Sequence, residues 1–104
     1  MPAQTDDGID KAGVGRRLRL TRLALQMPQG EFAARASIAA NTYNQFEHGA
    51  RLISPGKATA LCEEYNLTLD WIYRGDPSGL PYRLAAAIKA LTEVTPPTSK
   101  YPKC

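Results

Sequence analysis

The chain has 104 residues, of which 43% are hydrophobic and 22% are charged, and its formal net charge is +3. This length suits one domain whose core depends on tight helix packing or on a partner subunit. No apolar run approaches the roughly 20 residues that span a bilayer, and the acidic, polar first residues are no secretory signal. We therefore expect a protein of the cytoplasm with no membrane association.

Residues that commonly supply chemistry are few and scattered. The sequence contains two cysteines, Cys62 and Cys104, and one histidine, His48. Their spacing fits neither a metal site nor a disulfide framework, and no glycine-rich phosphate loop follows a strand pattern. We therefore expect no catalytic residue, no metal site and no cofactor.

Apolar periodicity predicts helices throughout and no β-strand. We expect a disordered leader over residues 1–10, followed by the first helix. Pro28 separates this helix from the next, because the residue before a proline avoids helical angles. Gly49 suits the left-handed position that ends a helix, and Pro55 suits a first helical turn. The expected helices cover residues 14–26, 29–36, 40–47 (starting at 39 or 40), 55–65 and 69–74.

The residue pattern in the last third of the chain predicts a short helix, a longer helix and a tail. We expect Asn66 to end the helix before it and Thr68 to cap the short helix. A helical period over residues 80–94 predicts a sixth helix, and residues 95–104 contain too much proline and polar side chain to fold alone. The period is carried by Leu84, Ala87, Ile88 and Leu91.

Basic residues are concentrated in the predicted folded part, which we place at residues 11–77, before a C-terminal helix and flexible tail over 78–104. The segment Lys11–Gly75 holds nine Lys and Arg residues against five Asp and Glu residues, so its net charge is 9 − 5 = +4. A basic excess on a compact body favours polyanionic partners such as nucleic acid. The alternative is a solvated surface with slightly more arginine than usual.

The stretch Gln29–Gly49 predicts two short helices joined by a tight turn. Ala33 lies where the two helices should cross closely, Ile38 follows the turn, and Phe46 anchors the second helix. The segment Val14–Gly75 resembles the lambda-repressor-like, or Xre-type, helix-turn-helix family. The matching features are the arginine-rich first helix, Gln29, Ala33, Ile38, FEHG at residues 46–49, and NLTLDWIYRG at residues 66–75.

This resemblance implies an all-α, five-helix DNA-binding domain, to which the sequence adds a C-terminal helix. Its third helix would enter the major groove of double-stranded DNA. Asn and Gln side chains can pair with adenine edges, and an alanine can contact only a thymine methyl group. The resemblance assigns base reading to Ala40, Asn41 and Gln45, and helical geometry adds Asn44. The alternatives are that the chain is an ordinary helical bundle, and that the amide side chains merely keep its surface soluble.

Contacts to the DNA backbone are expected from one glutamine and several basic side chains. The resemblance implies that Glu47 supports Arg22 structurally and turns it toward the DNA. Gln29 opens the second helix and is expected to contact a phosphate or a base edge. The alternatives are that Arg22 and Glu47 are two unrelated surface charges, and that Gln29 is an ordinary residue of a first helical turn. The expected phosphate-binding residues are Arg19, Arg22, Gln29, Arg51 and Lys57.

Three residues depart from the pattern of the resembled family. Pro28 stands where a Ser or Thr usually caps the second helix, so that cap is lost. Ser37 occupies a turn position where glycine is usual, and a left-handed conformation there costs roughly 1 kcal/mol. Tyr43 is bulky for an inward position, and we expect its hydroxyl at the surface.

Arg16 and Arg17 are expected either to help bind phosphate or to form a solvated face.

The sequence therefore predicts a transcriptional regulator, a repressor in our preferred interpretation, that binds a short operator as a homodimer. Two alternatives stay open: an antitoxin whose C-terminal extension binds a small toxin protein, and an interaction module that has lost DNA binding. The dimer surface is expected in one of two apolar segments unless these pack within the chain. The segments are Trp71, Ile72 and Tyr73, and the stripe from Leu84 to Leu91.

Overall fold

The computed structural model describes residues 9–94, the last of them through its backbone alone, and within that range it is all-α. Most of the predicted leader and the whole predicted tail lie outside the described residues. No helix among the described residues is long and apolar enough to cross a membrane. The elements are α1 (Lys11–Ala24), α2 (Gln29–Arg35), α3 (Ala40–Glu47), α4 (Pro55–Tyr65), η2 (Asp70–Arg74) and α5 (Tyr82–Val94).

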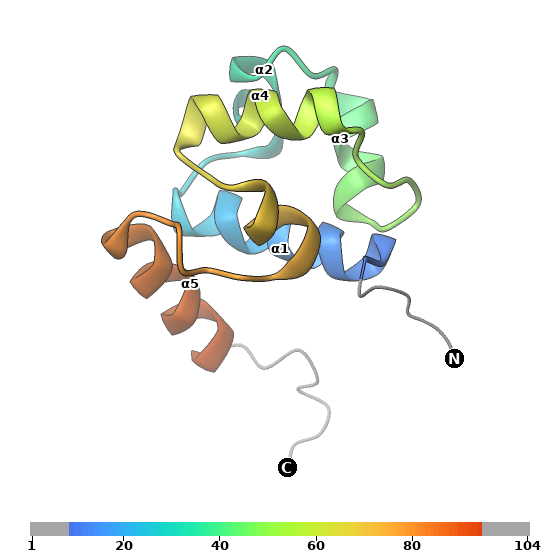
Figure 1. Cartoon of the computed structure of the whole chain (residues 1–104). Helices are drawn as coiled ribbons and strands as arrows, with labels where there is room; N and C mark the ends of the chain where they lie inside the picture. Colours follow the sequence, from blue (N-terminus) through green and yellow to red (C-terminus); the bar gives the residue numbers. More distant parts are fainter. Residues whose placement is uncertain (1–8, 95–104) are drawn as a thin grey trace, which may run out of the picture.

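Helix α1 lies at the centre of the arrangement (Figure 1), with α3 and α5 packed against it and η2 alongside. It begins three residues earlier than the sequence predicted, because Asp10 caps it: the Gly13 N–H donates to Asp10 Oδ1 over 2.7 Å. Aspartate is among the strongest N-cap residues. Asp10, which was expected in the disordered leader, therefore forms the start of α1.

Most turn residues behave as the sequence predicted, but Gln26, which was expected inside the first helix, lies beyond its end with a φ of 59°. Pro28 occupies the N-cap of α2 without a side-chain hydrogen bond. Ser37, Gly49 and Asn66 adopt positive φ angles of 61°, 75° and 59°. Thr68 Oγ1 accepts a hydrogen bond from the Trp71 N–H over 2.9 Å at the start of η2. The π-type winding of η2 was not predicted, since one short apolar turn carries no signal for it.

The core contains an aromatic cluster that joins α2, α3 and α4. The Phe32 ring stacks on Tyr65 at a centroid separation of 4.4 Å and packs against Tyr43 at 5.4 Å. Such aromatic contacts add to the free energy gained from burial alone. The largest side chains with less than 2% exposure are Tyr43, Phe32, Phe46, Leu18, Ile53, Leu61, Ile72, Val14 and Thr21.

Helices α1 and α3 cross at a glycine. A Cβ atom placed on Gly15 would lie 2.5 Å from the Glu47 carbonyl oxygen and 2.6 Å from that of Phe46. Real Cβ atoms essentially never come that close to backbone, so this crossing depends on the missing side chain. Close contact between helices was expected at Ala33, and the sequence pattern did not indicate this second close approach at Gly15.

The apolar segments proposed as dimer surface pack mostly within the chain. Trp71 is 6% exposed, and its Nε1–H donates to the buried Thr21 Oγ1 over 2.9 Å. The Tyr73 hydroxyl donates to the Ile53 carbonyl oxygen. Intramolecular packing is therefore the interpretation that holds for these residues. The other buried members of the two segments are Ile72, Leu84 and Ile88.

Candidate nucleic-acid interface

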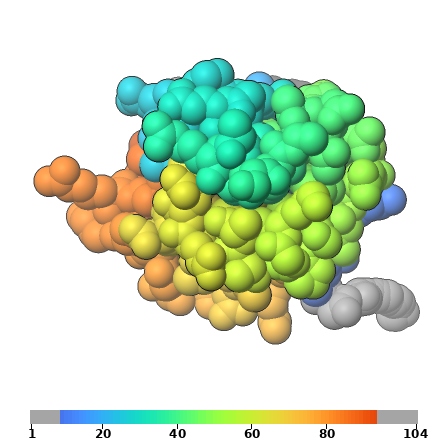
Figure 2. Space-filling model, turned by 90° about the horizontal axis from the view of Figure 1, so that it is seen from above, coloured from blue at the N-terminus to red at the C-terminus, as the bar shows by residue number. Residues whose placement is uncertain are grey.

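The segment from α2 to α3 forms two short helices around a tight turn, and Figure 2 shows both helices, with α4, on one face of the molecule. The Ile38 N–H donates to the Ala33 carbonyl oxygen over 3.0 Å across the turn at Ser37. Ala33, Ile38 and Phe46 are at most 4% exposed. The three residues assigned to helix support thus lie in the core that holds α3 in place.

Helix α3 has one buried side and one open side. Tyr43 and Phe46 face the core, whereas Ala40, Asn41 and Gln45 are exposed and Asn44 is half-buried. Three of the four expected base readers are therefore exposed to solvent. The helix is fixed to the core by its buried side, and its exposed side presents amide groups to solvent.

Arg51 lies next to this open side, just beyond the end of α3. Its Nη1 is 3.4 Å from Gln45 Oε1, and its guanidinium carbon is 5.8 Å from the centroid of the Phe46 ring. An arginine over an aromatic face gains a modest cation–π attraction. The side chain is exposed, so its remaining N–H groups face solvent.

Glu47 is the centre of a hydrogen-bond network that joins α1, α2 and α3. Its carboxylate accepts from Arg22 Nε at 2.7 Å and from Arg22 Nη2 at 3.2 Å. It also accepts from Gln29 Nε2 at 2.9 Å and from the Tyr43 hydroxyl at 2.6 Å. The side chains of Arg22 and Glu47 are only 13% and 4% exposed. The expected contact between these two residues is thus an ion pair largely shielded from water.

The network keeps its charges at neutral pH. Burial would raise the pKa of the Glu47 carboxyl, but hydrogen bonds from Arg22, Tyr43 and Gln29 outweigh it and leave that pKa below its ordinary value. The hydrogen bond to Glu47 raises the pKa of Arg22. Burial and the same carboxylate raise the pKa of Tyr43. The carboxylate is therefore ionised, the guanidinium charged and the phenol neutral.

The expectation that the Tyr43 hydroxyl reaches the surface is wrong. Tyr43 is fully buried, and its hydroxyl donates to Glu47 one turn along the same helix. A buried phenol needs a partner for its O–H, and the carboxylate supplies one inside the protein. The two residues are four positions apart, which is a neighbouring pair on a helix surface. That spacing was a signal available in the sequence.

Some of the hydrogen-bond donors of Gln29 and Arg22 are used within this network. Gln29 is half-buried, and one N–H of its side-chain amide serves Glu47. Arg22 donates Nη1 to the Met27 carbonyl oxygen over 3.0 Å as well as two N–H groups to Glu47. Arg19 and Lys57 are exposed on α1 and α4. The structure joins Arg22, Gln29 and Glu47 into one unit and leaves Arg19 and Lys57 apart from it.

Arg17 does not belong to a fully solvated face. Its Nε donates to the Ile72 carbonyl oxygen over 3.1 Å, and burial lowers the pKa of its guanidinium. Val14 and Thr21 lie one turn before and one turn after it, and both are buried. Residues three or four positions apart are neighbours on a helix surface, so this spacing indicated that Arg17 lies beside the buried side of α1. Arg16, in contrast, is exposed.

A family model described as helix-turn-helix matches residues 18–72, which is 55 of the 104 residues. The chain belongs to the helix-turn-helix family of the Xre, lambda-repressor-like type. The predicted resemblance and the all-α fold are thereby confirmed. Comparison with curated proteins and comparison with solved structures gave no match.

Membership in this helix-turn-helix family indicates DNA binding and a role in transcriptional regulation. The family is not catalytic, so the helix-turn-helix protein is not an enzyme. The matched segment begins within α1 and contains α2, α3 and α4 whole. Helix α5 lies outside it.

Proposed function

We propose that this protein represses transcription by binding a short operator as a homodimer, with α3 in the major groove. The observation that carries the proposal is the two-sided character of α3. Tyr43 and Phe46 fix its inner side, and the exposed Asn41 and Gln45 face outward. A helix of this kind fits the width of the major groove, where each base pair displays a distinct pattern of donors and acceptors.

Asn41 and Gln45 are the proposed base readers with hydrogen-bonding capacity. Each amide can accept from adenine N6 and donate to adenine N7, so the operator is expected to contain adenines at both positions. Ala40, at the start of α3, is the proposed contact to a thymine methyl group. Asn44 is half-buried and reads a base only at the edge of the contact.

The Glu47 network supports a phosphate contact from Arg22. A guanidinium has five N–H groups. Two of these donate to Glu47 and one to Met27, which leaves two for an oxygen outside the protein. Gln29 keeps one N–H in the same way. Arg22 would therefore meet the DNA backbone in a fixed direction, and Arg19, Arg51 and Lys57 would add exposed positive charge.

The small size of the contact supports a homodimer. A single α3 of eight residues reaches only a few base pairs. Two copies related by a twofold axis, with recognition helices about 34 Å apart, would read the two halves of a pseudo-palindrome. Their contacts would add, which is how short recognition elements reach useful specificity.

Selection of bound fragments from genomic DNA tests this proposal. We expect one enriched, pseudo-palindromic site, and an affinity for it that falls steeply with salt concentration because phosphate contacts release counterions. A protein that has lost DNA binding would enrich no site. An antitoxin would enrich a site and also co-purify with a second small protein through its C-terminal extension.

A matched pair of variants connects the result to α3. Asn41→Ala together with Gln45→Ala should abolish enrichment of the site and leave the fold intact, because both side chains are exposed. Arg35→Ala is the control: Arg35 is exposed on α2, where it forms an ion pair with the exposed Glu31 over 3.1 Å. Loss of enrichment in the control, or its retention in the double variant, would contradict the proposal.

A further inference from the structure

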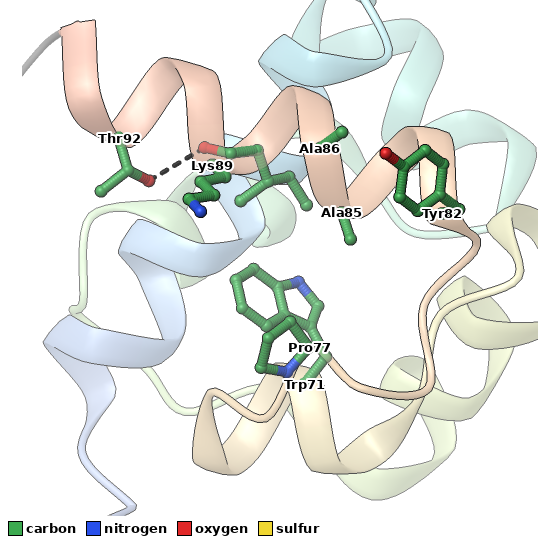
Figure 3. A pocket seen from close by; sticks show the side chains of 8 residues that line it. Trp71, Pro77, Tyr82, Ala85, Ala86, Lys89 and Thr92 are labelled. Carbon is green, nitrogen blue, oxygen red and sulfur yellow. Dashed lines mark hydrogen bonds between the residues drawn. The ribbon is translucent and has the colours of Figure 1, made fainter.

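A cavity of about 500 Å³ lies between α5 and the segment that contains η2. Figure 3 shows Trp71 and Pro77 on one side of this hollow and α5 on the other, with Ala85 pointing into it. Sites for small organic molecules in proteins commonly have volumes of roughly 300–1,000 Å³. The cavity therefore has room for a small molecule, and it lies outside the surface proposed to meet DNA.

The walls of the cavity are mainly apolar, and the fold holds them in place. Trp71 is 6% exposed, and its Nε1–H donates to Thr21 Oγ1 on α1 over 2.9 Å, so the indole ring has a fixed position. Ile88 of α5, which also lines the cavity, is buried. Ala85 and Ala86 on the same helix leave the space open, because their side chains are too short to fill it. A flat ring that enters the cavity would therefore find an aromatic wall already in position to pack against.

The polar groups that border the cavity favour an anion. The Lys89 side chain lines it, and among residues 9–94 its ammonium group makes no ion pair. Glu93 lies one turn further along α5, but within this part of the chain no ion pair joins it to Lys89. The Thr92 hydroxyl already donates to the Ile88 carbonyl oxygen over 2.9 Å. No aspartate or glutamate of the described segment lines the cavity, so one positive charge stands there without a counterion.

We propose that this cavity binds a small aromatic carboxylate. The ring of the ligand would lie between α5 and Trp71, with Pro77 beside it, and its carboxylate would accept a hydrogen bond from Lys89 Nζ. A neutral molecule of the same shape would bury the same apolar area without gaining an ion pair, and an amine would meet a like charge. A phosphate would leave most of its charge without a partner, because the remaining walls are apolar.

The ligand site is separate from the proposed DNA contact. Helix α1 packs against both α5 and α3, and Figure 1 shows it between these two helices. A ligand in the cavity therefore leaves the exposed face of α3 open. The ligand and an operator should bind to the same molecule together, and the ligand site does not depend on the operator that the proposed function requires.

Titration of the full chain with three probes of similar shape tests the proposal. The probes are phenylacetate, phenylacetamide and phenethylamine, which carry a negative charge, no charge and a positive charge. Trp71 is the sole tryptophan of the chain, so its fluorescence reports directly on the cavity wall. We expect phenylacetate to bind with a dissociation constant in the millimolar range, which is usual for so small a ligand. Phenylacetamide should bind about two- to fivefold more weakly, as expected for the loss of one exposed ion pair, and phenethylamine more weakly again.

Reversal of one charge tests the role of Lys89. Lys89→Glu should invert the order of the probes, so that phenethylamine binds best and phenylacetate worst. Lys11→Glu is the matched control, because it makes the same change of charge at the exposed start of α1, outside the cavity. In this control the order should stay as in the wild type. An unchanged order in Lys89→Glu, or an inverted order in the control, would overturn the assignment of the carboxylate to Lys89.

A filled cavity tests the position of the ring. Ala85→Leu places a larger side chain in the hollow and should weaken the binding of all three probes by about tenfold or more. Ala90→Leu is the control, because Ala90 is exposed on α5 and lies outside the cavity. Circular dichroism verifies that both variants are folded. If Ala85→Leu binds phenylacetate as well as the wild type does, the ligand site lies elsewhere and the inference is wrong.

The remaining outcomes separate this inference from the proposed function. Equal affinity for all three probes, or no response of Trp71 to any of them, would overturn the inference and leave the proposed function untouched. A change of fluorescence on dilution of the protein alone would assign the cavity to a second copy of the chain and overturn the inference as well. Displacement of phenylacetate by the selected operator would place the ligand on the DNA-binding surface, which also contradicts it. Failure to enrich any DNA site would refute the proposed function and leave the probe titrations standing.

Discussion

The Tyr43 hydroxyl lies 2.6 Å from Glu47 Oε2, and the two side chains are neighbours on the buried side of α3. This bond ties the carboxylate to its own helix. Arg22 from α1 and Gln29 from α2 then converge on the same carboxylate. Three helices are thus joined through one ionised group directly beneath the surface proposed to meet DNA.

Tyr43→Phe should destabilise the protein by about 1.5–3 kcal/mol, because it removes a hydrogen bond to a buried charged acceptor. Tyr65→Phe is the control: its hydroxyl donates to the neutral Phe32 carbonyl oxygen over 2.8 Å, and its loss should cost only about 1 kcal/mol. Urea unfolding measures both. Equal losses in the two variants would mean that the carboxylate gains nothing special from Tyr43.

Arg22→Ala should cost about 3–5 kcal/mol, since it leaves a shielded carboxylate without its counterion. Arg35→Ala, which breaks the exposed pair with Glu31, should cost at most about 1 kcal/mol. Thermal or urea unfolding of the two variants measures the difference. Comparable values would show that the Arg22–Glu47 pair is not shielded from solvent.

Acid should weaken the fold through Glu47. The pKa of this carboxyl is lower in the folded protein than in the unfolded chain, so the unfolded chain binds the proton more readily. The resulting stability is complete above the ordinary glutamate pKa of about 4.3 and declines as the pH falls from there through the lowered value. Unfolding free energies measured from pH 7 downward should fall more steeply for the wild type than for Glu47→Gln. Parallel curves would contradict the assignment.

Gly15→Ala should destabilise the protein by about 1–3 kcal/mol, because the new methyl group meets the backbone of α3. The helix propensity of alanine, about 1 kcal/mol better than glycine, offsets only part of this. Gly56→Ala in α4 is the control, since a Cβ there meets nothing within 4 Å and should stabilise slightly. If both variants gain stability, the α1–α3 crossing is looser than the structure indicates.

Local sequence signals predicted the framework well where one residue type decides a turn. Pro28, Gly49 and Asn66 ended or separated helices because proline, glycine and asparagine have strong backbone preferences. Ser37 adopts the left-handed conformation that its place in the turn required. The sixth helix followed from its apolar period and forms as Tyr82–Val94.

Features that depend on two distant segments could not be predicted in the same way. Gly15 matters only because Glu47 crosses it, and Tyr43 finds a buried partner only once α1 and α2 deliver their donors to the same carboxylate. The resemblance implied the contact between Arg22 and Glu47, but it did not include Gln29 as a further donor.

Arg51→Ala should reduce the salt dependence of DNA binding by about one released counterion and weaken binding to all sequences alike, as expected for a phosphate contact. Arg51 is exposed at the end of α3 and contributes only a modest contact with the Phe46 ring, so its removal should leave the protein folded. Fluorescence anisotropy across a range of salt concentrations gives the slope. A change in sequence preference with an unaltered slope would reassign Arg51 to base reading.

The most direct test of the central claim is the affinity of Asn41→Ala for the selected operator and for an unrelated duplex, measured at several salt concentrations. If α3 reads bases, discrimination between the two duplexes should fall by about 1–3 kcal/mol while the salt slope stays the same. A variant that discriminates as well as the wild type would show that the exposed amide face of α3 does not read the operator.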